Sequence, residues 1–167
     1  MITSGSGVGN VHNDVAAISH GFEVVAAARN WLGTPYHHQA SKRGLGCDCL
    51  GLVRGVWRDC YGFDAEVAPA YTRDWAEARG EETLLAAASR HLVRRNSGLF
   101  ETGDILIFRY ARGLPAKHAA IATSATHMIH AIEKRGVVEV AIVPAWRRRI
   151  AGVFAFPGVD ATWQRSH

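Results

Sequence analysis

A cysteine stands where a polar loop becomes an apolar helix, in the segment Gly46-Cys47-Asp48-Cys49-Leu50-Gly51-Leu52-Val53. The N–H groups of a first helical turn have no internal partners, and the helix dipole adds partial positive charge at that end. Both effects favour thiolate over thiol, so the segment predicts a lowered pKa for Cys49. Asp48 suits the N-cap position, because its carboxylate can accept hydrogen bonds from that turn.

Cys49 is the stronger candidate nucleophile of the segment, since Cys47 lies two residues earlier in the loop. A free cysteine more commonly packs as a small apolar residue, which is the alternative for Cys49. Gly46 and Gly51 favour the nucleophile, because small neighbours let a substrate backbone approach. Cys47 and Cys49 stand too close for easy pairing, and no second cysteine pair follows. We therefore expect neither a disulfide framework nor a zinc site.

Helical periodicity surrounds this segment. A helix over about 49–61 is predicted by a shared apolar face, and its members are Cys49, Leu52, Val53, Val56 and Cys60. Gly62 is expected to end that helix. An earlier helix stops at Gly33-Thr34-Pro35, and its spacing is set by Phe22, Val25, Ala26, Arg29 and Leu32. Residues 72–92 also predict a helix, with a break at Gly80.

The second half of the chain changes to short apolar strands. They are expected at 104–110, 118–123, 127–132, 137–143 and 150–156. Short connections favour antiparallel neighbours, and helices followed by strands predict an α+β fold. We expect one domain over 20–158, between an N-terminal arm over 1–19 and a C-terminal tail over 159–167.

Composition excludes several classes of function. The chain has 167 residues, and no apolar run is long enough to predict a transmembrane helix. Residues 1–10 are rich in Gly and Ser and lack the basic and apolar regions of a signal peptide, so a secreted role would need another export route. The net charge of +4 and the cluster Arg147-Arg148-Arg149 indicate either a solvated surface or attraction to a polyanion such as an anionic cell wall. No nucleic-acid motif accompanies the cluster, so nucleic acid is not an expected partner.

His118 and His130 are the candidates for a general base and its orienting partner. His118 follows a loop and opens a strand, an accessible position that suits a base. His130 lies inside the next strand, where a half-buried imidazole needs a hydrogen-bond partner. If the two strands form a hairpin, His130 can hold His118 in the correct tautomer. The alternative is an ordinary surface or core histidine at either position, and spacing alone leaves both open.

Five short motifs, in this order, resemble the NlpC-type family of papain-like cysteine peptidases, which cut peptides of the bacterial cell wall. They are Trp31-Leu32-Gly33-Thr34-Pro35-Tyr36, Asp48-Cys49-Leu50-Gly51-Leu52-Val53, Gly103-Asp104-Ile105-Leu106, His118-Ala119-Ala120-Ile121 and Met128-Ile129-His130-Ala131. The resemblance runs from about Phe22 to Pro157. It implies a papain-like fold, with the nucleophile at a helix N-terminus packed on a five-stranded antiparallel sheet.

The resemblance also implies a role for each site residue. Cys49 would be the nucleophile, His118 the base and His130 the residue that orients it. Tyr36 would lie by the cleft near the developing oxyanion, and Asp48 would bind a free amino group of the substrate, which is compatible with capping. No metal or organic cofactor is implied. The implied reaction is hydrolysis of the peptidoglycan peptide stem, of the γ-D-glutamyl–diaminopimelate endopeptidase type.

One position departs from the family, because Leu50 stands where many members have serine, and this affects specificity. The chain is similar to the branch found in tailed phages and gene transfer agents at Asp48–Val53, Trp57, Tyr61-Gly62, Trp146–Arg149 and Phe154–Pro157. That branch implies tail or baseplate partners and a location at the tail tip of a phage-like particle. It also implies synthesis in the cytoplasm without a signal peptide, and action in the periplasm or cell wall without membrane insertion. The alternatives are a peptidoglycan amidase, a cross-link endopeptidase, or a structural tail-tip protein with a silent or occluded site.

Overall fold

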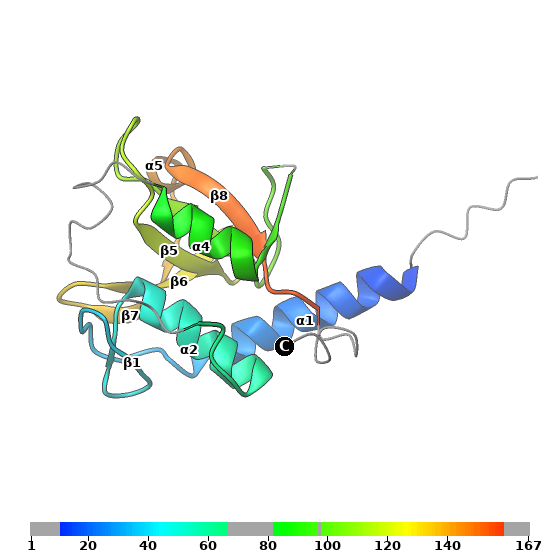
Figure 1. Cartoon of the computed structure of the whole chain (residues 1–167), viewed down its shortest axis with the longest axis horizontal. Coiled ribbons are helices and arrows are strands. Elements are labelled where there is room, and N and C mark those ends of the chain that lie inside the picture. Colours follow the sequence, from blue (N-terminus) through cyan, green and yellow to red (C-terminus); the bar gives the residue numbers. More distant parts are fainter. Residues whose placement is uncertain (1–10, 67–81, 97, 159–167) are drawn as a thin grey trace, which may run out of the picture.

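The computed structural model describes residues 11–66, 82–96 and 98–158, with side chains described from His20 onward. Within these ranges helices come first and strands follow, so the predicted α+β class is confirmed (Figure 1). The first half contains α1 (Val11–Arg29), β1 (Ser41–Lys42), β2 (Gly46–Cys47) and α2 (Cys49–Tyr61). The second half contains α4 (Thr83–His91), β3 (Val93–Arg94), β4 (Ile105–Phe108), β5 (His118–Ala122), β6 (His127–Ile132), β7 (Gly136–Ala141), α5 (Pro144–Arg147) and β8 (Ile150–Ala155).

The described strands β3 to β8 form one antiparallel sheet in the order β3-β8-β4-β5-β6-β7. All five predicted strands are present in it. The sheet has six strands rather than five, because β3 pairs with the end of β8. This strand is only two residues long and its side chains are exposed, so it carries no alternating apolar pattern that could predict it. The two-residue strands β1 and β2 pair separately and are equally short.

Helix α2 begins and ends where the sequence predicts. Oδ1 of Asp48 accepts a hydrogen bond from the N–H of Gly51 at 2.8 Å, which is the expected N-cap. Gly62 follows the last helical residue in the left-handed region, with φ 82°, and its N–H donates to the Arg58 carbonyl. Cys49 is therefore the first residue of the helix.

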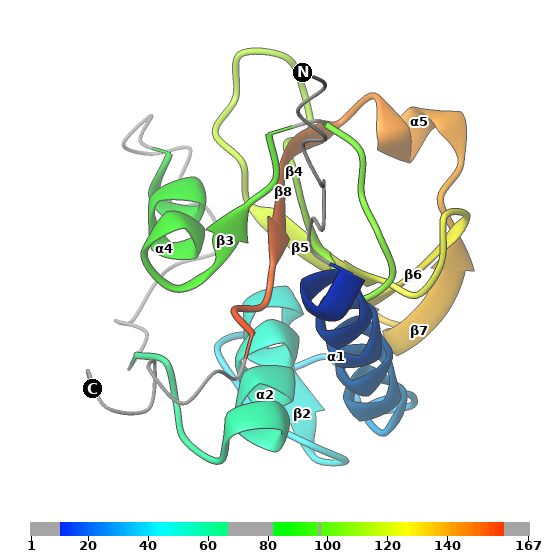
Figure 2. The ribbon, with the colours of Figure 1, turned by 90° about the vertical axis from the view of Figure 1, so that its right-hand side faces the viewer.

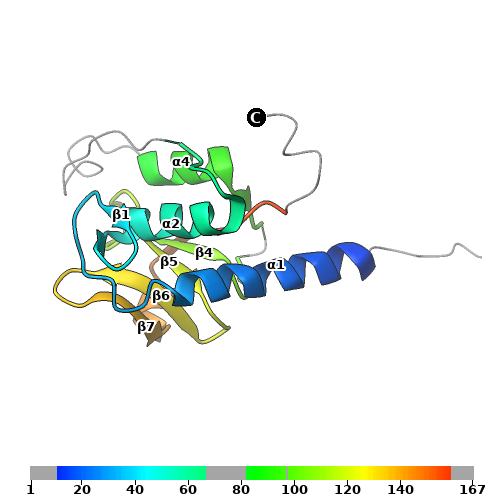
Figure 3. The same cartoon turned by 90° about the horizontal axis from the view of Figure 1, so that it is seen from below.

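Helix α1 begins at Val11 and so extends into the segment predicted as an N-terminal arm. Residues 1–10 and 159–167 lie outside the described residues, and the predicted domain limits stay predictions. The helix expected over 72–92 is described only in part, as α4, and the expected break at Gly80 lies outside the described residues. α1 and α2 lie side by side on one face of the sheet (Figure 3), and α5 lies apart from both of them (Figure 2).

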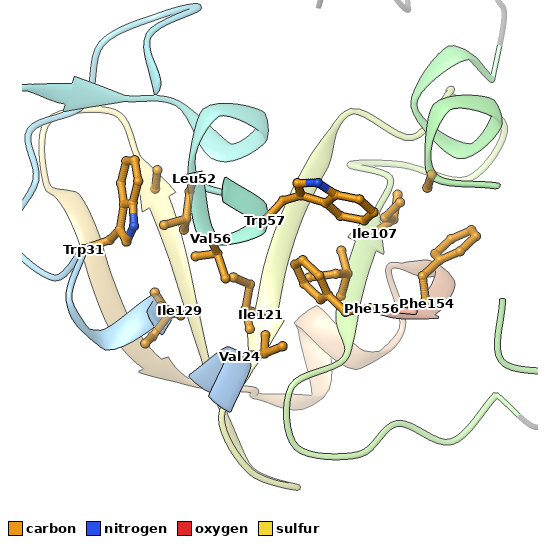
Figure 4. Close-up of a cluster of buried hydrophobic side chains, with 14 of the residues drawn as sticks. Val24, Trp31, Leu52, Val56, Trp57, Ile107, Ile121, Ile129, Phe154 and Phe156 are labelled. Carbon is orange, nitrogen blue, oxygen red and sulfur yellow. The ribbon is translucent and has the colours of Figure 1, made fainter. Parts of the chain in front are cut away.

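The main core fills the space between α1, α2 and the sheet (Figure 4). Leu52 and Val56 of α2 pack with Ile121 and Ile129 of the central strands. A second, smaller cluster covers the other face of the sheet, and its buried members are Leu106, Phe108, Ala120, Ala122, Met128, Ile142 and Val153. The two clusters follow the alternation of side chains along each strand.

Trp31 closes one end of the main core against α2. Its indole N–H donates to Oδ2 of Asp59 at 2.8 Å, which fixes the orientation of the ring. The ring lies so close to Gly55 that a Cβ at that position would come within 2.0 Å of it. Only glycine therefore lets α2 approach the ring, and this approach sets the position of the helix that carries Cys49.

We predict that Gly55→Ala destabilises the protein by about 1–3 kcal/mol, because an added methyl group forces the Trp31 ring or α2 to move. Urea unfolding followed by tryptophan fluorescence measures this change. Gly158→Ala is the matched control, since a Cβ there meets nothing within 4 Å, and it should stay within about 0.5 kcal/mol of the parent. Equal stabilities for both variants would contradict the prediction.

Candidate active site

The start of α2 places Cys49 against the first residues of β5. The Cys49 thiol donates a hydrogen bond to the Lys117 carbonyl at 3.9 Å, and the backbone N–H of Ala119 also bonds to the sulfur. These two residues flank His118, so the sulfur lies beside the backbone that carries the predicted base. The fold thus brings together two residues that are 69 positions apart in the sequence.

The β5–β6 ladder stops short of this site. Among the described residues it consists of the pairs Ile121↔Ile129 and Ala122↔Met128, next to the hairpin turn. Both histidines lie beyond the last pair, on the side away from the turn. Because β6 does not pair with the start of β5, the backbone groups of Lys117 and Ala119 remain available to Cys49.

The predicted contact between the two histidines is present. Nε2 of His118 lies 3.0 Å from Nδ1 of His130, with the ring planes 72° apart. The two side chains are buried, with exposed fractions of 5% and 1%. A neutral His118 that donates its Nε2–H to His130 keeps the Nδ1 lone pair, which can accept a proton from a thiol.

The predicted lowering of the Cys49 pKa is wrong. Burial, with a smaller contribution from the Asp48 carboxylate, raises the pKa of the Cys49 thiol to about 11. The N–H groups of Cys49, Leu50 and Ala119 do lower this pKa, as expected at a helix start, but the opposing effects are larger. The thiol is therefore protonated at neutral pH.

The histidine pair is neutral at the same pH. Burial, followed by repulsion from His130, lowers the pKa of His118 to about 3. Burial, followed by the positive charge of Arg135, lowers the pKa of His130 to about 4. At neutral pH the site therefore contains a neutral thiol and a neutral imidazole, and a base that activates the thiol must take its proton during attack rather than before it.

Asp48 joins the helix start to the preceding loop. Oδ1 accepts from the Gly51 N–H, and Oδ2 accepts from the Gln39 N–H at 2.7 Å. Nδ1 of His38 lies 3.6 Å from Oδ2, and the carboxylate is buried. The capping role is thus present, whereas recognition of a substrate amino group stays a prediction.

Tyr36 lies beside β2, the short strand that precedes the nucleophile in the chain. It forms a parallel bridge with Cys47, and the N–H of His37 donates to the Cys47 carbonyl at 3.0 Å. The tyrosine is half-buried against the main core. Its role near an oxyanion stays a prediction.

The residue that the site analysis of the sequence missed is Trp146 of α5. Its indole ring packs against both histidines, with ring centroids 5.6 Å from His118 and 5.5 Å from His130. The sequence showed it only as the first residue of a basic run, because nothing in the spacing connects α5 with β5.

In the part of the chain that the structure describes, no group of three or more His, Cys, Asp or Glu residues could hold a metal ion. No helix among the same residues is long and apolar enough to cross a membrane.

Residues 33–154 match the family model described as the NlpC/P60 family, which is more than half of the chain. The chain belongs to the NlpC/P60 family. This is a family of cysteine peptidoglycan hydrolases, and the match contains Cys49, His118 and His130. No curated protein sequence matches the chain.

Solved structures share the NlpC/P60 fold. The NlpC/p60 domain of the peptidoglycan hydrolase SagA is 25% identical, with a TM-score of 0.53, and the match covers 82% of this chain and 97% of that domain. An NlpC/P60 family protein from Bacillus cereus ATCC 10987 is 19% identical, with a TM-score of 0.59 over 81% of this chain. A protein similar to an NLP/P60 family lipoprotein from Staphylococcus aureus is 17% identical, with a TM-score of 0.53 over 92% of this chain. The chain spans only 40% of the Bacillus cereus protein and 45% of the Staphylococcus aureus protein.

We predict that the free energy of unfolding falls as the pH drops from about 6.5 toward 4. The unfolded chain binds protons on its histidines near pH 6.5, whereas in the folded protein His118 and His130 have pKa values of about 3 and 4. Acid therefore favours the unfolded state. Each histidine should cost about 2 kcal/mol at pH 5. Urea unfolding at a series of pH values measures the slope.

Two histidines of β6 provide the variant and the control for this measurement. His130→Asn removes one of the two titrating groups and should flatten the slope between pH 6.5 and 4. His127→Asn changes an exposed histidine of β6 and should leave the slope as it is. A His130→Asn slope equal to that of the parent would contradict the prediction.

We also predict that Asp48→Asn lowers the pKa of the Cys49 thiol below about 11: burial, the larger cause of the raised pKa, remains, but the negative charge of Asp48 is removed. Alkylation rates of the Cys49 peptide, followed by mass spectrometry across pH, measure this. Cys60 is the internal control, since burial, Asp59 and Glu23 raise its pKa. A parallel change at Cys60 would indicate general loosening and count against the prediction.

Proposed function

We propose that this protein hydrolyses an amide bond in the peptide stem of peptidoglycan by a Cys-His-His thiol mechanism. One observation carries the proposal: the thiol at the start of α2 bonds to the residues on both sides of His118, whose imidazole is joined to His130. Membership of the NlpC/P60 family supports the substrate class.

In the proposed reaction the Cys49 sulfur attacks the carbonyl carbon of the scissile amide, and the thiol proton passes to Nδ1 of His118. The imidazolium then gives this proton to the leaving nitrogen as the C–N bond breaks, which leaves a thioester on Cys49. A water molecule, deprotonated by the same imidazole, attacks the thioester carbonyl. The S–C bond breaks, the thiol regains its proton, and the acid product departs.

His130 stabilises this cycle through its bond to His118, which is strongest when His118 is charged. The negative oxygen of each tetrahedral intermediate is assigned to the backbone N–H of Cys49, at the positive end of α2, and to Tyr36. The loss of one such donor commonly raises the barrier by about 3 kcal/mol. This mechanism needs no metal or organic cofactor.

The proposed bond is the one between D-glutamate, through its γ-carboxyl group, and diaminopimelate. The support is the resemblance of the motifs around Cys49 and His118 to endopeptidases of this type, together with the 25% identity to the NlpC/p60 domain of the peptidoglycan hydrolase SagA. Leu50 replaces a serine that many family members have at this position, so the acyl side of the substrate should be recognised differently. Asp48 is proposed to assist recognition of a free amino group there.

The proposed setting is the tail tip of a phage-like particle that breaches the cell wall. Its support is the likeness of Asp48–Val53 and Trp146–Arg149 to the branch found in tailed phages and gene transfer agents. The net charge of +4 favours attraction to an anionic cell wall. The protein would be made in the cytoplasm and delivered to the periplasm by tail or baseplate proteins.

Digestion of purified peptidoglycan, followed by mass spectrometry of the products, tests the proposal. The parent protein and Cys60→Ala, which changes a thiol outside the site, should release the same stem fragments. Cys49→Ala should lower the rate by at least about 1,000-fold, because the sulfur that forms the thioester is removed. The fragment masses distinguish the proposed bond from an amidase or a cross-link endopeptidase product. Blank digests from folded parent protein would instead favour a structural tail component.

A further inference from the structure

The indole of Trp146 touches both histidines of the site from an element that carries no other site residue. The indole plane is tilted by 32° from the ring plane of His118 and by 83° from that of His130. It therefore lies over the His118 ring at a tilt and meets the His130 ring edge to face. Trp146 is itself held by Phe108, whose ring centroid is 5.0 Å away at 70°. The indole therefore covers the two histidines on the face of the sheet opposite α2.

The orientation of the His130 ring depends on packing. Its Nδ1 is joined to His118, but its Nε2 is buried without a hydrogen-bond partner among the described residues. A histidine that orients a second group is ordinarily held by a bond at its other nitrogen. With one bond only, the angle of the His130 ring depends on packing, and the edge-to-face contact of Trp146 supplies that packing.

His118 is enclosed in the same way. The rings of Phe108 and Tyr110 lie 6.0 Å and 6.2 Å from it, each tilted by 39°. Trp146 contacts both His118 and His130. Removing its indole would open the pair to solvent and free the ring of His130 at the same time.

We propose that Trp146 is the positioning residue of the histidine pair: its indole holds the His118–His130 hydrogen bond in place and keeps water from Nε2 of His130. The catalytic consequence rests on the proposed peptidase function, whereas the effect on the two imidazoles does not. The charged and titratable groups around the pair come from several parts of the fold, and they are Cys49 of α2, Tyr110 after β4, Lys117 before β5 and Arg135 after β6.

The test compares Trp146→Ala with Trp146→Phe and Ile150→Ala. Ile150 packs in the same cluster as Trp146, so its truncation loosens the cluster while the indole stays. Phe restores an aromatic ring and should rescue in part. Trp146→Leu replaces Ala if the latter does not fold, because Leu keeps apolar volume without the aromatic face.

The first readout is the pH dependence of kcat and KM for peptidoglycan fragments. In Trp146→Ala the acid limb of kcat should move upward by about one pH unit or more, because the exposed pair titrates closer to the ordinary histidine value. kcat at neutral pH should fall about 10- to 100-fold with little change in KM, because the base is misplaced while the substrate still binds. Ile150→Ala should shift neither the limb nor kcat by this amount.

The second readout needs no activity. Nuclear magnetic resonance of protein labelled with ¹⁵N in histidine follows the titration of His118 and His130 directly. An upward shift of both titrations in Trp146→Ala, with partial return in Trp146→Phe, supports the proposal even if the parent protein releases no fragments, in which case only the proposed function fails. Titrations and an acid limb that move no further than in Ile150→Ala overturn it, even in an active enzyme.

Discussion

The carboxylate of Asp48 is the contact on which the site depends. It caps α2 through Gly51 and holds the N–H of Gln39 with its other oxygen, so one side chain fixes both the helix start and the loop before it. The Ala40 carbonyl comes so close that a Cβ on Gly51 would lie 1.8 Å from it, and the position therefore requires glycine. Because Cys49 is the next residue after Asp48, the same interaction places the sulfur against β5.

A second constraint comes from where the strands stop pairing. The β5–β6 ladder ends before the histidines, which leaves room for the sulfur at the backbone of β5 and allows the two imidazoles to meet. Burial then makes the resting thiol and both histidines neutral. In the proposed mechanism a neutral resting site links proton transfer to attack, so the site avoids a permanently charged thiolate in an apolar setting.

The sequence allowed much of the fold to be predicted, since its signals are local. Asp48 and Gly62 mark the ends of α2, and short runs of apolar residues mark the five longer strands. The two-residue strand β3 has no such pattern, and its pairing with β8 comes only from the return of the chain to that edge. The hairpin prediction for His118 and His130 was correct, because a short connection between two strands leaves few alternative arrangements.

The sequence by itself determined which residues are the candidates for the chemistry: a cysteine at a helix start and two histidines on consecutive strands. Only the tertiary structure decided how they are tuned. Local reasoning gave Cys49 a lowered pKa from the helix N–H groups, but burial, which depends on everything packed around the sulfur, reverses the sign. Trp146 likewise has no spacing relation to His118 in the chain, and it joins the site because α5 folds back over the far face of the sheet. Desolvation and packing are sums over neighbours from distant segments, so no local pattern records them.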